Sequence, residues 1–249
     1  LRMKRQRRVV AVVLVISQGL AGATNSTSPE AWVTAIQMRD VGRLSLLLEN
    51  GFVDINLSNK KDKTALMVAA QAGDLPLCLD LVAAGARINV QNENGGTPLM
   101  HAAVGGNPEI VSLLLSVQAQ TDTAAVNGWT ALALAAAKGH VAIVGSLLRA
   151  TADPNLADIF GWTPLMHAVE QERRETVALF LGQSDIRVNL QNLDGVTALH
   201  RAVAQGFREI SGMLVKSGAR IDLPDQTGRT AVDYAREAQQ IQILKDLGG

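Results

Sequence analysis

Histidine, cysteine and carboxylate side chains are the residues that could do chemistry in this chain, and their spacing decides which chemistry. The four histidines are His101, His140, His167 and His200. No stretch around them has the spacing of a zinc site, a nucleophile elbow, a phosphate-binding glycine loop or a pair of catalytic carboxylates. We therefore expect no enzymatic activity, no cofactor and no catalytic or metal site.

The single cysteine, Cys78, lies in LPLCLDLV at a helical position where later segments carry Val111 or Val144. A free cysteine at an apolar position behaves as a small hydrophobic residue. It has no second cysteine with which to form an intramolecular disulfide. We expect Cys78 to be buried and unreactive.

The composition favours small aliphatic residues: 47% of the 249 residues are hydrophobic and only 3% are aromatic. Such a core suits short, close-packed helices. The net charge is zero, but five basic residues and no acid fall within residues 1–23. The remainder holds 18 basic residues against 23 acidic ones, a net charge of −5. A mildly acidic body argues against nucleic acid as the main partner.

Residues 1–23 have the three parts of a secretory signal peptide. Basic residues precede an apolar run over residues 9–16, and the segment AGA that ends at Ala23 has the small-residue pattern of a cleavage site. We expect cleavage after Ala23 and export to the periplasm or the cell exterior. The run is shorter than the ~20 apolar residues that span a bilayer, so we expect no stable membrane span after cleavage. A retained anchor and a cytosolic product are the alternatives.

A period of about 33 residues organises the rest of the chain. Six threonines open similar phrases such as TPLMHAA and TALALAA, with separations of 33, 33, 33, 34 and 33 residues: Thr64, Thr97, Thr130, Thr163, Thr197 and Thr230. A fixed period of this length indicates stacked units, each of which buries its apolar side against its neighbours.

Each recurring position has a mechanical reason. A threonine caps a helix N-terminus well, and Pro98 and Pro164 fall at the first helical residue, where no N–H is needed. A glycine nine residues after the threonine, as at Gly106, permits the left-handed turn that ends the first helix. Ile, Val and Leu at 3–4 spacing then predict a second helix. Segments such as INVQNENGG predict tight, projecting turns.

The phrase T-P-L-x-x-A-A, the glycine nine residues later, EIVSLLL and a terminal Asn or Asp resemble the ankyrin repeat from about residue 30 onwards. The resemblance implies an all-α solenoid of about seven helix-loop-helix units with β-hairpin fingers. We assign residues 24–249 to this domain, with units near 27–58, 59–91, 92–124, 125–157, 158–191, 192–224 and 225–249.

The fifth unit departs from the pattern, because Glu172 stands where other units have the turn glycine. A non-glycine residue held in a left-handed conformation costs about 1 kcal/mol. The polar run EQERRE and an extra residue near GQSDIRVN lie in the same unit. We expect this unit to be the least stable joint of the array.

The resemblance also implies positions and roles for the histidines. His200 occupies the position that usually holds histidine in ankyrin repeats, which implies a structural hydrogen bond between adjacent units. His101 and His167 lie one residue further on, towards the concave face, and His140 follows a turn glycine. Two units separate His101 from His167, about 20 Å, which is too far to share a zinc ion.

Aromatic residues on the fingers are the first candidates for partner binding. Trp129 and Trp162 precede the threonines of adjacent units, and Ile159 and Phe160 occupy a finger position that is polar elsewhere. Exposed aromatic residues are frequent binding hot spots. For the two tryptophans, packing on a neighbouring finger and contact with a partner are both open; for Ile159 and Phe160 we favour contact.

A second candidate surface is the concave row formed four residues after each threonine: Val68, His101, Leu134, His167, Arg201 and Tyr234. This mixed, mostly apolar row suits a protein or peptide. We expect it to form one binding face together with Trp129, Phe160 and Trp162.

These observations predict an exported, monomeric, non-catalytic scaffold that binds a protein partner through a preorganised surface. Two alternatives remain open. One is a secreted effector that binds a host protein, and the other is a sensor that holds a small ligand or a metal in the groove. The fold alone does not choose the partner.

Overall fold

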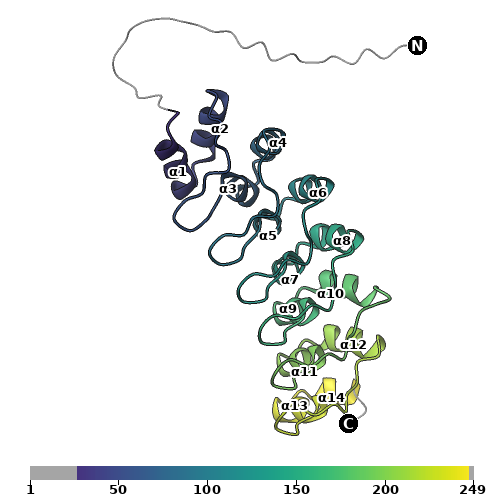
Figure 1. The fold of residues 1–249 in the computed structure, drawn as a ribbon. Coiled ribbons are helices and arrows are strands. Elements are labelled where there is room, and N and C mark those ends of the chain that lie inside the picture. Colours follow the sequence, from purple (N-terminus) through teal and green to yellow (C-terminus); the bar gives the residue numbers. More distant parts are fainter. Residues whose placement is uncertain (1–26, 247–249) are drawn as a thin grey trace, which may run out of the picture.

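The computed structural model describes residues 27–246, and within them fourteen α-helices form seven antiparallel pairs (Figure 1). The predicted signal peptide over residues 1–23, with its cleavage point, lies outside the described residues. The first helices of the pairs are α1 (Pro29–Met38), α3 (Ala65–Ala72), α5 (Pro98–Gly105), α7 (Ala131–Lys138), α9 (Pro164–Glu170), α11 (Ala198–Ala204) and α13 (Ala231–Glu237). The second helices are α2 (Val41–Glu49), α4 (Leu75–Ala83), α6 (Pro108–Ser116), α8 (Val141–Arg149), α10 (Arg174–Leu181), α12 (Arg208–Lys216) and α14 (Ile241–Asp246).

The six periodic threonines cap the first helices, as the sequence predicts. In each case the hydroxyl accepts a hydrogen bond from the third helical N–H; in α7, Thr130 Oγ1 accepts from Ala133 N at 3.2 Å. Pro98 and Pro164 occupy the first helical position of α5 and α9. The first pair differs, because Ser28 caps α1.

The predicted left-handed turns are also confirmed. Gly106 ends α5 with φ of +78°, and Glu172 adopts φ of +53° at the equivalent position after α9. An added Cβ at position 106 would also lie 2.8 Å from the imidazole of His140, which would have to shift. The next unit therefore packs directly on this turn.

The pairs stack with first helices against first helices and second helices against second helices (Figure 1). Close approach is possible because one alanine of each first helix from α3 onwards is completely buried at the contact: Ala69, Ala102, Ala135, Ala168, Ala202 and Ala235. One continuous apolar core runs through the array, and Cys78 lies fully buried in it. Helix α1 shows no comparable contact with α3; the first pair joins the array through α2.

A recurring asparagine links the end of one unit to the next. Asn89 Oδ1 accepts from Gln120 N at 2.9 Å, and Asn89 Nδ2 donates to Gln118 O at 3.2 Å. The same two-way link recurs at Asn56, Asn155 and Asn189. Asp122 occupies the equivalent position in the third unit and, having no donor, only accepts from Asp153 N.

The fingers are short loops that project to one side of the first helices (Figure 1). Within residues 27–246 no strand is formed, and a single antiparallel bridge joins Ser58 to Thr64. The predicted β-hairpins are therefore reduced to tight turns closed by backbone hydrogen bonds, such as Asn92 N to Gly96 O and Gly95 N to Asn92 O. None of the described helices has the length and apolarity needed to cross a membrane.

Candidate protein-binding face

Five of the six fingers are held by an Asn or Asp five residues before the threonine; the fourth finger has Ala125 there, and Asn127 Oδ1 accepts from Trp129 N at 3.2 Å instead. In the fifth unit Asp158 Oδ1 accepts from Phe160 N and Trp162 N, both at 2.9 Å. The same double acceptor recurs at Asn59, Asn92, Asn192 and Asp225. The sequence predicted tight turns in these segments without identifying the residues that hold them. The regular spacing from the threonine was the signal that could have identified the correct set.

The concave row contacts these finger residues. His167 Nε2 lies 3.0 Å from Asp158 Oδ2, and His101 Nε2 lies 3.2 Å from Asn92 Nδ2. Tyr234 donates its O–H to Asp225 Oδ2 at 2.7 Å. The concave row therefore positions the fingers. Its side chains are less accessible to a partner than the sequence predicted. Val68 and His167 are buried, whereas His101, Leu134, Arg201 and Tyr234 are half-buried.

Burial and hydrogen bonding shift the pKa values of the polar groups where the concave row contacts the fingers. Burial is the largest influence on His167 and lowers its pKa below the ordinary value, although Asp158 and Glu170 act in the opposite direction. Burial raises the pKa of Asp225, but hydrogen bonds from Thr227, Tyr234 and backbone N–H groups outweigh it, and the net direction is downwards. Asp225 therefore remains an acceptor for the seventh finger at neutral pH.

Both tryptophans pack inside the array. The Trp129 ring centroid lies 4.0 Å from that of His167, and Trp162 stacks on the same imidazole at 5.5 Å. The Arg201 guanidinium lies 5.4 Å from the Trp162 ring and forms a 2.6 Å ion pair with Glu170. The structure thus supports intramolecular packing for both indoles, which are half-buried and keep one side open to solvent.

Four of the exposed large apolar residues lie at the finger tips of three consecutive units. Their exposed fractions are 74% for Val126, 55% for Ile159, 59% for Phe160 and 62% for Leu193. We call these four residues the apolar tip row. Adjacent fingers are joined by backbone hydrogen bonds, such as Ile159 N to Asn127 O at 3.2 Å and Leu193 N to Phe160 O at 3.0 Å. The row is therefore held on a stiff edge.

A groove of about 500 Å³ lies beside this row, between the fingers and helices α5 and α7. It brings together four residues predicted from the sequence: His101, Trp129, Leu134 and Ile159. Met100, Val104 and Val126 add apolar surface. Arg201 and Tyr234 do not line it, since they lie further along the array. The predicted face is therefore divided, and its apolar part is concentrated in the third to fifth units.

Comparison with known proteins agrees with this architecture. The family model described as Ankyrin repeats (3 copies) matches residues 66–158, 120–192, 146–225 and 165–248. The chain belongs to the ankyrin repeat family. Ankyrin arrays are protein-interaction scaffolds, and this one presents its apolar finger tips on a preformed edge.

One solved structure adds a specific relative of this ankyrin array. It is the complex of a predatory endopeptidase from Bdellovibrio bacteriovorus with an immunity protein. The matched chain is 33% identical, with a TM-score of 0.67, and the match covers 77% of our chain and 98% of that one. Altogether 616 solved chains match, so the fold alone does not specify the partner. No functionally curated protein matches the chain.

His200 has a structural role in this ankyrin array. Its Nδ1 accepts from the Thr197 backbone N–H at 3.1 Å, so the hydrogen bond lies within one unit and completes a capping box. Contact with the next unit is made by the ring, which meets Tyr234 edge-on at 5.3 Å between centroids. The expected structural role is present, and the ring of His200 contacts the next unit.

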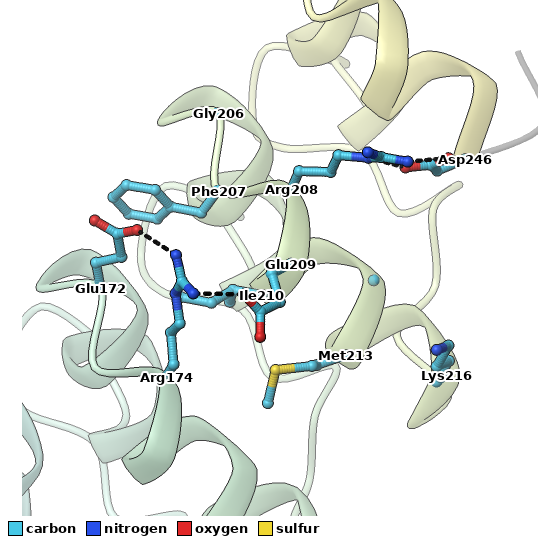
Figure 2. A pocket seen from close by; sticks show the side chains of 11 residues that line it. Glu172, Arg174, Gly206, Phe207, Arg208, Glu209, Ile210, Met213, Lys216 and Asp246 are labelled. Carbon is cyan, nitrogen blue, oxygen red and sulfur yellow. Dashed lines mark hydrogen bonds and ion pairs between the residues drawn. The ribbon is translucent and has the colours of Figure 1, made fainter.

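A cavity of about 690 Å³ lies against α12 (Figure 2). Figure 2 shows Arg174 between Glu172 and Glu209, with Arg208 directed at Asp246. These charges neutralise one another across three successive units. We therefore assign this cavity to the joints of the ankyrin array and not to a partner site.

Candidate chemical groups are sparse in the part of the chain that the structure describes. No group of three or more His, Cys, Asp and Glu side chains between residues 27 and 246 could hold a metal ion. Burial, with a smaller contribution from Asp74, raises the pKa of Cys78 to about 12, so its thiol is protonated at neutral pH. The arrangement is suited to recognition.

Proposed function

We propose that this chain is exported and binds a protein partner, without catalysis, through the apolar tip row and the adjoining groove. The basic and apolar pattern of residues 1–23 supports export to the periplasm or the cell exterior. Within residues 24–249 the ankyrin array supplies a preorganised surface, which lowers the ordering cost of association.

The observation that carries this proposal is the apolar tip row itself. Four large apolar side chains, each more than half exposed, gather on three consecutive fingers. Isolated exposed apolar residues need no explanation, but a contiguous set on a rigid edge is typical of an interaction surface. Phe160 is the best anchor, because aromatic side chains dominate binding hot spots.

The solved relative suggests a class of partner to test first. Its structure contains an endopeptidase in complex with an immunity protein. Because that chain matches over nearly its whole length, we propose that an exported peptidase is the partner of our chain and that binding restrains its activity. The fold alone does not specify the partner, so the partner must be identified by capture.

The test compares two triple variants. The tip variant is Val126→Ser, Phe160→Ser and Leu193→Ser; the control variant is Met38→Ser, Val53→Ser and Ile241→Ser, at exposed apolar sites of the terminal units. Each purified protein is immobilised and exposed to a periplasmic extract of the producing organism. Captured proteins are identified by mass spectrometry and assayed for peptidase activity with and without the array.

We expect wild type and the control variant to capture the same protein, and the tip variant to lose it while its circular dichroism and thermal midpoint stay unchanged. A folded tip variant that captures as well as wild type would refute the placement of the site. A captured partner without peptidase activity would leave the site in place and overturn the proposed partner class.

A further inference from the structure

The groove beside the apolar tip row continues into a second cavity towards the N-terminal end of the array. This cavity, about 510 Å³, is lined by Arg39 at the end of α1 and by three lysines of the second-unit finger, Lys60, Lys61 and Lys63. The two cavities have three lining residues in common: Asn92, Asn94 and His101. One continuous groove is therefore basic at one end and apolar at the other.

The cations of the basic end are poorly neutralised. Of these four cations, only Lys61 forms an ion pair with an acidic side chain among the described residues. Its partner is Glu93 at 3.5 Å, and this pair is exposed. Lys63 Nζ donates to an uncharged group, Gln71 Oε1, at 3.3 Å. The sequence of residues 1–26, which the structure does not describe, contains no Asp or Glu. The excess positive charge at this end is thus unusual in a chain whose body is acidic.

Arginines further along the same face are paired. Arg201 Nη2 lies 2.6 Å from Glu170 Oε2, and Arg229 contacts Asp225 and Glu237 at 3.2 and 3.3 Å. Charge pairing therefore neutralises the cations of the last units, whereas Arg39, Lys60 and Lys63 in the first two units have no ion pair among the described residues. This difference gives the groove a direction along the array.

The cations at the basic end are close enough to influence one another. Burial, followed by Arg39 and Lys61, lowers the pKa of Lys63. Burial, followed by Lys63 and Arg39, lowers the pKa of His101 to about 4. Like charges held together in a partly buried hollow are stabilised by an incoming anion.

We propose that this groove binds an extended segment of the partner protein that carries acidic residues beside an apolar stretch. The carboxylates contact Arg39, Lys60 and Lys63, and the apolar side chains lie against Trp129 and Leu134. This inference rests on the proposed function and specifies the chemistry of the bound segment. Nucleic acid fits less well, because the apolar half of the groove offers no phosphate contacts.

The test uses random twelve-residue peptides displayed on phage as the probe. They are selected on the purified wild-type chain, on Arg39→Glu/Lys60→Glu, and on the control Lys138→Glu/Lys216→Glu, which makes the same change in net charge. Arg39, Lys60, Lys138 and Lys216 are all exposed, so the fold tolerates each reversal. Unchanged circular dichroism and thermal midpoints verify this.

We expect wild type and the control to select peptides with Asp and Glu beside apolar residues, and the Arg39/Lys60 variant to lose the acidic preference while keeping the apolar one. A selected peptide, measured by fluorescence anisotropy, should bind that variant about tenfold or more weakly and wild type more weakly as salt increases. Selection without an acidic excess, or equal affinity for all three proteins, overturns the inference. Failure of wild type to select any peptide overturns it as well.

The outcomes also separate this inference from the proposed function. Loss of peptide binding in the tip variant, with no effect of reversing Arg39 and Lys60, leaves the tip-row site standing and removes the acidic segment. Loss through Arg39 and Lys60 with no effect of the tip variant contradicts the proposed function instead.

Discussion

The Trp129 indole of the fourth unit lies on the His167 imidazole of the fifth, with 4.0 Å between ring centroids. His167 in turn lies 3.0 Å from Asp158, which closes the fifth finger. A side chain that the sequence offers as a binding anchor therefore also joins two units. The effects on stability and on binding are therefore separated by comparing a substitution within this stack with one at an exposed fingertip.

Trp129→Ala should lower the free energy of unfolding by about 2 kcal/mol, because a half-buried indole loses both apolar area and its aromatic neighbour. Phe160→Ala, at an exposed fingertip, should change it by less than about 0.5 kcal/mol. Urea denaturation followed by circular dichroism measures both. Equal effects of the two substitutions would show that the stack contributes nothing to stability.

Acidification from pH 7 to pH 5 should destabilise the array. Burial, with Lys63 and Arg39, lowers the pKa of His101 from 6.5 to about 4, so the unfolded chain takes up a proton first. The stability present above about pH 6.5 is lost as pH falls towards 4, by about 1 kcal/mol at pH 5 for this partly exposed ring. His167 and His200, whose pKa values are also lowered, act in the same direction.

His101→Gln tests this assignment, since an amide keeps a polar group opposite Asn92 and does not titrate. Urea midpoints recorded between pH 7 and pH 5 should fall less steeply for this variant than for wild type. Parallel profiles for the two proteins would exclude His101 as the source of the acid sensitivity.

Thr151→Gly should stabilise the array by about 0.5–1 kcal/mol. Thr151 is exposed and adopts φ of +63°, a conformation that is costly for a β-branched residue. Gly85 occupies the equivalent turn of an earlier unit with φ of +90° and no heavy atom near an added Cβ. Gly85→Ala should therefore destabilise by about 1 kcal/mol through backbone strain alone. Thermal denaturation of both variants checks the pair, and two changes of the same sign would contradict the argument.

The fifth unit should exchange its amide hydrogens faster than the fourth. Glu172 holds φ of +53°, and α9 and α10 are each one residue shorter than α7 and α8. The ion pairs of Arg174 with Glu172 and Glu209 offset part of this cost, but they are exposed and weak. Hydrogen exchange read by mass spectrometry compares the two units directly. Protection of α9 and α10 equal to that of α7 and α8 would show that the fifth unit is as stable as the fourth.

Glu172→Gly extends the same comparison. Relief of the left-handed strain should slow exchange in α9 and raise stability by up to about 1 kcal/mol. Exchange that becomes faster would mean that the Glu172–Arg174 pair outweighs the strain.

Local features of the array were predictable because they depend on contacts a few residues apart. Thr130, Pro164 and Gly106 act within a single helix turn, so their spacing suffices to predict caps and turns. The finger residues of the Asn92 and Asp158 type obey an equally local rule, and their distance from the threonine would have revealed them. The capping box that His200 Nδ1 completes within its own unit is an equally local feature, set by its distance of three residues from Thr197.

The sequence by itself determined that this protein is a stack of helix pairs, since a 33-residue period leaves each pair no other partner for its apolar side. Only the tertiary structure decided which side chains remain free. Trp129 and Trp162 share the context GWT with exposed fingertips nearby, yet His167 and Arg201 from other helices cover them. Val126 and Leu193 stay exposed because nothing in the stack reaches the tips. The burial of these side chains depends on residues of neighbouring units, and the sequence of one unit does not show which of those residues come into contact with it.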